Sequence, residues 1–439
     1  MENTREWLKI RKERAILMGA VIKGSDDGDN LEELTALAES AGAIVVDRFQ
    51  QKMATPHPVR YIGKGKAEML AERVEKYNAD VVIFDNDLSP RQIRELEKVI
   101  NTKVIDRSEL ILDIFASRAQ TTQAKLQVEL AQLEYTYPRL TKMWSHLDSV
   151  AGAGGGTGAG AVGAIGTRGT GEKQLEIDRR LSKDRVSELK AKLSVIDKRK
   201  VREISSREAV FKACLVGYTN AGKSTVLNAL TGAGVYVEDK LFATLDTKTK
   251  KWKPESSVAV LLSDTVGFVR DIPHHLVASF KATLEEAVNA DLLIHVIDVA
   301  SEGVLKKVES VKKVLKEIGC GKKDVLCVFN KVDAVKNLEP LEMLQTMFPD
   351  ALTISAKTGY GLDELARTVA EKCKGLQMHL KITVGARDGK LQSFLRSMGS
   401  SIIDEQYDGD KVIFEVKIGE EQFIRLQTLK KEDIEIEHI

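Results

Sequence analysis

Apolar runs alternate with amphipathic stretches along residues 16 to 106. Strand-like runs are ILMGAVI, AIVVDRF, VVIF and KVIDR, and helical periodicity marks LEELTALAESAG and the stretches beginning at about Lys66 and after Pro90. Regular alternation of strands and helices is typical of a parallel sheet covered by helices. We therefore predict an N-terminal α/β subdomain over residues 1 to 107.

A second pattern, with apolar residues three and four positions apart, occupies the middle of the chain. One stripe consists of Leu126, Leu130, Leu133 and Tyr137, and a second, within a charged stretch from about Gln174 to Arg202, consists of Val186, Leu189, Leu193 and Ile196. Such spacing places apolar side chains on one face of a helix. Two stripes of this kind predict an antiparallel helical hairpin over residues 108 to 207.

Between the two predicted helices, residues 151 to 171 contain ten glycines and a single charged residue, Arg168. Glycine-rich chain loses much conformational entropy when it adopts one structure. One interpretation is a flexible linker, and the other is a loop that becomes ordered against a partner. The length favours the second, because a connection between packed helices needs only about 2–8 residues.

A phosphate-binding pattern follows the hairpin. The apolar run AVFKACLV leads into GYTNAGKS, residues 217 to 224, and then into the helical pattern STVLNALTG. A strand, a glycine loop ending in Lys-Ser, and a helix form the P-loop arrangement. Backbone N–H groups of the loop face the phosphates, Lys223 neutralises the β and γ oxygens, and the Ser224 hydroxyl can bind Mg²⁺.

Two further segments match the parts of a GTPase that respond to the γ-phosphate. An apolar strand ends in DTVG, where Asp264 can hold Mg²⁺ through its water shell and the Gly267 N–H can sense the γ-phosphate. Upstream, FATLD supplies Thr244 in a loop that can close on the metal when the γ-phosphate is present. Their order along the chain is the order that a guanine-nucleotide domain requires.

Choice of base is predicted from VLCVFNKVD and TISAK. Asp333 can accept two hydrogen bonds from the guanine edge, while Lys331 lies along the ring and Asn330 ties its loop to the P-loop. The Ala356 N–H can donate to the guanine carbonyl oxygen. Adenine would leave the Asp333 carboxylate unpaired, a mismatch that discriminates strongly. The predicted nucleotide is therefore GTP, with GDP as product.

The complete predicted site groups these motifs by role. Catalytic roles are expected for Lys223, Thr244 and Gly267, and Mg²⁺ ligation for Ser224, Thr244 and Asp264. Nucleotide contacts are expected from Gly217, Tyr218, Thr219, Asn220, Ala221, Gly222, Lys223, Ser224, Thr225, Phe242, Ala243, Thr244, Leu245, Asp246, Asp264, Thr265, Val266, Gly267, Asn330, Lys331, Val332, Asp333, Ser355, Ala356 and Lys357.

Phe268 stands directly after DxxG, where many GTPases place a glutamine that orients the attacking water. Phenylalanine cannot hydrogen-bond water, so we predict slow hydrolysis by the isolated protein and acceleration by a partner. Asparagine at the place of Asn220 is associated with GTPases that a potassium ion assists, which makes K⁺ a candidate cofactor.

The remaining segments complete the domain division. Residues 208 to 375 are assigned to the P-loop GTPase domain, and residues 376 to 439 to a small α+β C-terminal domain of the order strand, helix, strand, strand, helix. The Asp408-Gly409 pair between alternating runs predicts a hairpin turn. The fold class is therefore α/β with a short α+β end.

Charge and composition limit the cellular setting. Residues 118 to 212 carry 18 Lys and Arg against 11 Asp and Glu, whereas the whole chain has a net charge of only +1. This local excess fits either an anionic partner such as nucleic acid or a solvated helical face. The four cysteines form no close pair, which predicts reduced core thiols, and no run approaches the ~20 apolar residues of a membrane span. We expect a cytoplasmic monomer.

Several flanking stretches narrow the family. LFATLD, DTVGFVRDIPHHLVASFKATLEEA, QAKLQVELAQLEY and GTRGTGEKQLEIDRR together resemble the HflX family of ribosome-associated GTPases, up to about residue 375. The resemblance implies binding to the large ribosomal subunit and its ribosomal RNA, with the hairpin loop near the peptidyl transferase region. It also implies that the GTP-bound protein helps to separate stalled or idle ribosomes.

Two other functions compete with this one. A GTP-dependent switch could recruit a protein partner through the hairpin without any ribosomal role. An ATP-using kinase or transport ATPase is disfavoured by NKVD and SAK.

Overall fold

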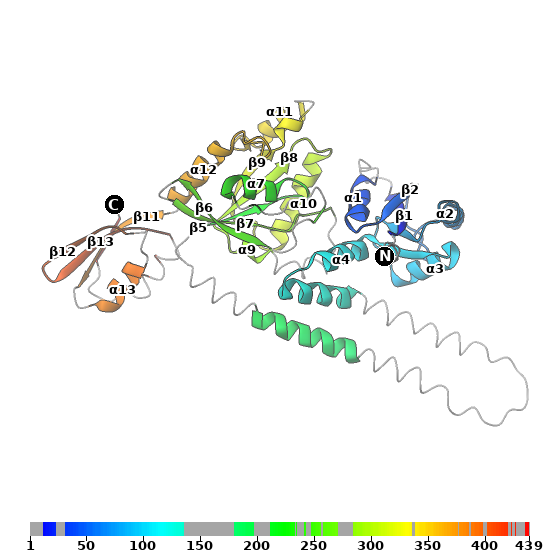
Figure 1. Ribbon diagram of the computed structural model, residues 1–439, viewed down its shortest axis with the longest axis horizontal. Helices are drawn as coiled ribbons and strands as arrows, with labels where there is room; N and C mark the ends of the chain where they lie inside the picture. Colours follow the sequence, from blue (N-terminus) through cyan, green and yellow to red (C-terminus); the bar gives the residue numbers. More distant parts are fainter. Residues whose placement is uncertain are drawn as a thin grey trace, which may run out of the picture.

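The computed structural model describes residues 12–22, 31–135, 180–196, 211–232, 234, 241–242, 247–255, 258–270, 284–335, 339–375, 377–385, 388–397, 402–419, 423, 426 and 435–438. Among these residues the named strands form three sheets, which lie in three parts of the molecule (Figure 1). The GTPase sheet is central, and the N-terminal and C-terminal sheets lie on opposite sides of it.

The N-terminal sheet is parallel, as the alternating pattern predicts. Its order is β2-β1-β3-β4, with β1 at Arg14–Ile22, β2 at Ile44–Met53, β3 at Val81–Phe84 and β4 at Lys103–Asp106. The accompanying helices are α1 at Glu32–Ser40, α2 at Lys64–Tyr77, α3 at Pro90–Ile100 and α4 at Arg107–Arg118. Ser89 caps α3 through a capping box with Gln92, which explains why the helix begins at Pro90.

Neighbouring residues of β1 point to opposite faces of this sheet, as a strand requires. Leu17 packs in a core with α1 and α4, while Ile16 and Met18 pack in a second core with α2 and α3. The subdomain is therefore a sheet between two helical layers. Helix α4 belongs to the first of these layers, although it begins at the predicted boundary between subdomain and hairpin.

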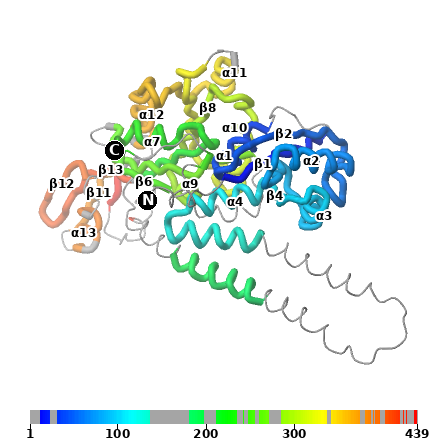
Figure 2. Tube along the Cα trace, turned by 45° about the vertical axis from the view of Figure 1, so that its right-hand side comes forward, coloured from blue at the N-terminus to red at the C-terminus, as the bar shows by residue number. Residues whose placement is uncertain are grey.

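The two apolar stripes of the predicted hairpin do pack against each other. Residues 122–135 and 180–196 are helical and lie side by side (Figures 1 and 2). Their cluster consists of Leu130, Leu189 and Leu193, with Leu126, Leu133 and Val186 against it. Ion pairs between Arg185 and Glu129 at 2.6 Å and between Lys190 and Glu134 at 2.9 Å flank this cluster. Tyr137 and the glycine-rich segment lie outside the described residues.

The GTPase sheet has the order β10-β9-β8-β5-β7-β6, and its pairs are parallel except for β6 with β7. The strands are β5 at Phe211–Val216, β6 at Lys248–Glu255, β7 at Val258–Asp264, β8 at Leu292–Asp298, β9 at Asp324–Asn330 and β10 at Leu352–Thr353. The helices are α7 at Lys223–Thr231, α9 at Glu285–Val288, α10 at Val304–Glu317, α11 at Glu339–Met347 and α12 at Leu362–Gly375. Residues of α7 and α12 pack on one face, and residues of α9 and α10 on the other.

One hydrophobic core joins the N-terminal subdomain, the hairpin and the GTPase domain. It contains Leu34 of α1, Phe115 of α4, Val128 of the first hairpin helix, and Phe268 and Val311 of the GTPase domain. The three parts therefore share one buried surface and are not separate bodies joined only by linkers.

The C-terminal sheet is antiparallel with the order β12-β13-β11-β14. Its elements are β11 at Gln377–Gly385, α13 at Gly389–Ser397, β12 at Ile402–Asp408, β13 at Lys411–Gly419 and β14 at Glu435–His438. The predicted hairpin turn is present, with Gly409 at a φ of 57°. The pattern did not predict β14, whose four residues include one aliphatic side chain, Ile436, and the predicted final helix falls mostly on residues outside the described ranges.

The structure also bears on the predictions about the cysteines and about membrane spans. All four cysteines are free thiols, and three of them are buried. Within the described ranges, no helix is both long and apolar enough to cross a membrane.

Replacement of Leu189 by alanine should loosen the hairpin. Leu189 is fully buried between the two helices, and such a truncation costs ~2–5 kcal/mol. We expect faster hydrogen exchange across residues 180 to 196, with unchanged exchange in the C-terminal sheet. The control Leu181→Ala, at a position that is 57% exposed, should leave the exchange unchanged. Equal effects of the two variants would contradict the packing described here.

Candidate nucleotide site

Two positions of the P-loop require glycine, because neighbouring atoms leave no room for a Cβ atom. Gly217 has a φ of 152°, and a Cβ there would lie 2.3 Å from the Val296 carbonyl oxygen. Gly222 has a φ of 92°, and a Cβ there would lie 2.3 Å from Asn330 Nδ2. The loop is thus pressed against β8 and the end of β9. Helix α7 begins directly after Gly222 without a side-chain cap, so its first N–H groups are available to an anion.

Lys223 turns back into this loop. Its Nζ donates to the Gly217 carbonyl at 3.2 Å and to the Tyr218 carbonyl at 2.9 Å. Burial lowers the pKa of Lys223 to about 8, although the nearby Asp264 carboxylate acts in the opposite direction. A phosphate group bound in the loop would favour the charged ammonium.

Ser224 and Asp264 provide oxygen atoms that fit Mg²⁺. Ser224 Oγ donates to Asp264 Oδ2 at 2.5 Å, and Asp264 is completely buried at the end of β7. A hydroxyl and a carboxylate at one point are ligands that this small, hard cation accepts together with water and phosphate oxygens. Thr244, the third expected ligand, lies outside the described residues.

The DxxG segment lies directly on the P-loop. The Phe268 N–H donates to the Gly217 carbonyl at 3.1 Å, and the Thr219 N–H donates to the Phe268 carbonyl at 2.7 Å. A Cβ on Gly267 would lie 2.7 Å from Thr219 Cα and 2.9 Å from Lys223 Nζ. The ring of Phe268 is buried in the shared core. Gly267 therefore meets Thr219 and Lys223 at one point, while the Phe268 side chain is held in the core.

The two loops predicted to recognise the base are tied together through Asn330. Its Nδ2 donates to the Ala221 carbonyl at 2.9 Å, and its Oδ1 accepts from the Ala356 N–H at 3.0 Å. The first contact is the expected link to the P-loop. The second contact uses the Ala356 N–H, which the sequence predicts to donate to the guanine carbonyl oxygen. Asp333 Oδ1 accepts from Ser355 Oγ at 2.7 Å, so the carboxylate is held against the second loop.

Other predicted residues have different surroundings. Lys331 Nζ pairs with Asp298 Oδ2 at 2.8 Å, and Thr265 Oγ1 donates to the Leu215 carbonyl at 2.7 Å. Phe242 packs edge-on against Phe115 with ring centroids 4.7 Å apart, and Val266 is buried in the same core. Val332 packs beside α10 and α11. Thr225 is partly buried in the first turn of α7, and Lys357 is exposed. Ala243, Thr244, Leu245 and Asp246 lie outside the described residues.

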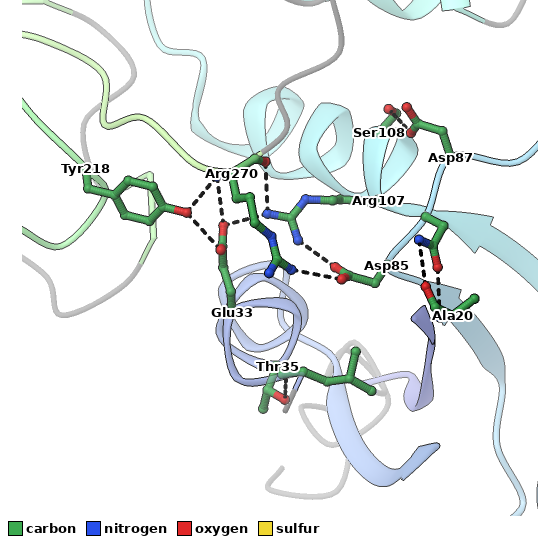
Figure 3. Close-up of polar contacts among 11 residues, drawn as sticks. Ala20, Glu33, Thr35, Asp85, Asp87, Arg107, Ser108, Tyr218 and Arg270 are labelled. Carbon is green, nitrogen blue, oxygen red and sulfur yellow. Dashed lines mark hydrogen bonds and ion pairs between the residues drawn. The ribbon is translucent and has the colours of Figure 1, made fainter. Parts of the chain in front are cut away.

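A buried ionic network connects these loops to the N-terminal subdomain (Figure 3). Arg107, at the start of α4, pairs with Glu33 of α1 at 2.5 Å and with Asp85 after β3 at 2.6 Å. Tyr218 of the P-loop donates its hydroxyl hydrogen to Glu33 at 2.8 Å. The backbone N–H of Arg270, two residues after Phe268, donates to the Tyr218 hydroxyl at 2.6 Å. The Arg270 guanidinium pairs with Asp85 at 3.0 Å.

The charges in this network hold one another in place. Burial alone would lower the pKa of Arg107, but the Glu33 and Asp85 carboxylates raise it above its ordinary value. Burial and the Glu33 carboxylate raise the pKa of Tyr218, so its hydroxyl stays protonated. Glu33, Asp85 and Arg107 are not among the residues predicted from the sequence. No motif marks them, and an arginine at the start of an apolar helix is the only visible signal.

A cavity of about 630 Å³ opens beside the P-loop. Its walls come from α1, the loop itself and the first turns of α10, and they include Thr219, Asn220, Arg270, Lys306 and Lys307. The cavity therefore reaches the phosphate-binding loop from the side of the N-terminal subdomain.

Most of the chain matches known protein families. Residues 28–116 match a family described as GTP-binding GTPase N-terminal, residues 118–207 match its middle region, and residues 212–331 match the 50S ribosome-binding GTPase family.

Individual relatives extend over nearly the full length. A protein of Lacrimispora saccharolytica described as GTPase HflX is 41% identical over 424 residues, covering 95% of this chain and 96% of the relative. GTPase HflX of Escherichia coli is 40% identical, covering 87% and 88%. A GTP-binding protein of Sulfolobus solfataricus, solved in complex with GDP, is 25% identical and covers 83% of this chain and 99% of that chain, with a TM-score of 0.43.

Replacement of Arg107 by methionine should destabilise the joined domains strongly. The variant leaves Glu33 and Asp85 without their buried cation, and breaking a buried pair from one side costs ~3–5 kcal/mol. We expect a lower midpoint of denaturant unfolding, measured by fluorescence. Arg185→Met removes a half-exposed arginine from two ion pairs and should change the midpoint little. A stable Arg107→Met protein would show that the network is not a structural requirement.

GTP affinity should fall as pH rises above about 8. Below that pH, Lys223 is already charged in the free protein, so affinity should be flat. Above it, binding must take up a proton, and the dissociation constant should rise by up to about tenfold per pH unit. Titrations with a fluorescent GTP analogue from about pH 7 to about pH 9 measure this dependence. Lys223→Arg keeps its charge over this range and should flatten the profile. The same slope in both proteins would exclude Lys223 as its source.

Proposed function

Because this chain belongs to the HflX family of GTPases, and therefore binds and hydrolyses GTP, we propose that it acts on the large ribosomal subunit. We further propose that its GTP-bound form helps to separate stalled or idle ribosomes. The observation that carries the proposal is the match of residues 212–331 to the 50S ribosome-binding GTPase family. Ribosomal RNA is the partner expected for the basic middle segment.

The surface of the described part of the hairpin supports an anionic partner. The described helix of residues 180–196 places Arg180 on its exposed surface, while Lys183 is exposed one turn further along. Phosphate contacts with exposed cations dominate affinity for nucleic acid and make it depend on salt. The first hairpin helix also packs on the core that contains Phe268 and Phe242, and the second helix packs on the first. A change at the nucleotide loops can therefore alter the position of the hairpin.

Slow intrinsic hydrolysis is part of the same proposal. The Phe268 side chain offers no hydrogen-bonding group and is buried in the shared core. A ribosome that shifts the DxxG segment would change the geometry on which turnover depends. The expected cofactor is Mg²⁺, held by Ser224 and Asp264, which would stabilise the developing charge on the phosphates.

Potassium is a further proposed cofactor. Asn220 has a φ of 59° and lines the cavity beside the P-loop. If K⁺ assists, GTP turnover should be higher in KCl than in NaCl at equal ionic strength. Equal rates in the two salts would exclude this role.

Co-sedimentation with purified large subunits tests the ribosomal role. We expect more protein to pellet in a non-hydrolysable GTP analogue than in GDP, and less as salt rises. Reversal of two hairpin charges, Arg180→Glu with Lys183→Glu, should reduce pelleting, because each lost cation weakens phosphate binding. Reversal of Lys313 and Lys316 on α10 is the matched control, since both are exposed and lie outside the hairpin.

Two results would count against the proposal. Absence of pelleting in either nucleotide would favour the alternative function, a switch that recruits a protein partner. Equal loss of pelleting in both double variants would remove the hairpin from the interface.

A further inference from the structure

One hydroxyl group of the P-loop is buried without a partner. Thr219 is only 7% exposed, and within the described part of the chain its Oγ1 makes no hydrogen bond. A buried polar atom that lacks a partner costs ~1–3 kcal/mol. Neighbouring hydroxyls do have partners, because Ser224 donates to Asp264, Thr265 to the Leu215 carbonyl and Tyr218 to Glu33. The Thr219 hydroxyl is therefore the exception in this loop and calls for an explanation.

The surroundings of Thr219 are the two groups expected to hold the γ-phosphate. A Cβ on Gly267 would lie 2.8 Å from Thr219 Cγ2 and 2.9 Å from Lys223 Nζ, so the three residues meet at one point. Threonine side chains occupy staggered rotamers, and a rotation of about 120° around Cα–Cβ brings Oγ1 to the place of Cγ2. That rotation would turn the hydroxyl toward Gly267 and Lys223 without moving the backbone.

The reaction needs a group of this kind. Hydrolysis requires a water oriented toward the γ-phosphorus, and Phe268 cannot hydrogen-bond it. A threonine hydroxyl can both accept and donate a hydrogen bond. Thr219 also lines the cavity that opens beside the P-loop, which gives water a route to this point.

We propose that Thr219 is a catalytic residue whose hydroxyl orients the attacking water by accepting a hydrogen bond from it. The water oxygen forms the new bond to the γ-phosphorus, and the bond from that phosphorus to the bridging oxygen breaks. The electron pair leaves with GDP, and the water proton passes to the released phosphate. The hydroxyl takes no proton permanently. This role concerns GTP hydrolysis itself and does not depend on the ribosomal proposal.

Single-turnover GTP hydrolysis by the full-length protein tests the role. Thr219→Val keeps the shape of the side chain and removes the hydroxyl, and it should lower the rate on the order of tenfold to a hundredfold. Thr219→Ser restores a hydroxyl and should recover most of that loss. Affinity for GTP and GDP should stay within about threefold in both variants, because the lost contact forms only in the reaction.

A matched control separates chemistry from packing. Thr35→Val in α1 also removes a buried threonine hydroxyl, one that donates to the Leu31 carbonyl at 2.6 Å (Figure 3), and it should leave the rate unchanged. Affinity for GDP with aluminium fluoride, which mimics the transferring phosphate with its attacking water, gives a second readout. Thr219→Val should weaken that complex while GDP affinity stays the same.

Each other outcome overturns the proposal. An unchanged rate in Thr219→Val would remove the hydroxyl from the reaction. An equal loss in Thr219→Ser and Thr219→Val, or a parallel loss of GTP affinity, would assign Thr219 a structural role only.

Discussion

A single buried guanidinium, that of Arg107, holds the N-terminal subdomain and the nucleotide loops together. Its two carboxylate partners, Glu33 and Asp85, also bind Tyr218 of the P-loop and Arg270 after the DxxG segment. Charges at such depth are stable only while every partner stays in place. The loops that bind phosphate therefore cannot rearrange without affecting the partners of Arg107.

This constraint has a mechanical consequence. The shared core contains Phe242 and Phe268 from the two segments predicted to respond to the γ-phosphate, Phe115 of α4 and Val128 of the first hairpin helix. Packed cores respond to a shift by moving between discrete arrangements more readily than by gradual deformation. A γ-phosphate bound near Gly267 could thus change the position of the hairpin. The hairpin is the surface proposed to bind the ribosome.

Local patterns predicted the elements of this molecule well. The P-loop, DxxG and NKVD motifs each lie at the carboxyl end of a strand, where the parallel GTPase sheet brings them together, and the two leucine stripes pair as periodicity suggested. These features depend on residues close in sequence. Glu33, Asp85 and Arg107 could not be predicted, because their partners lie 22 to 237 positions away and no spacing rule reveals such pairs. Phe242 and Val266 adjoin motif residues, which predicts nucleotide contacts, and their side chains lie in the shared core.

The most direct measurement is steady-state GTP turnover by the purified protein as large ribosomal subunits are added in increasing amounts. The account predicts slow turnover alone and a several-fold, saturable increase with large subunits, because their binding would reach the DxxG segment through the hairpin and the shared core. Turnover that is already fast without ribosomes, or that large subunits leave unchanged, would contradict it.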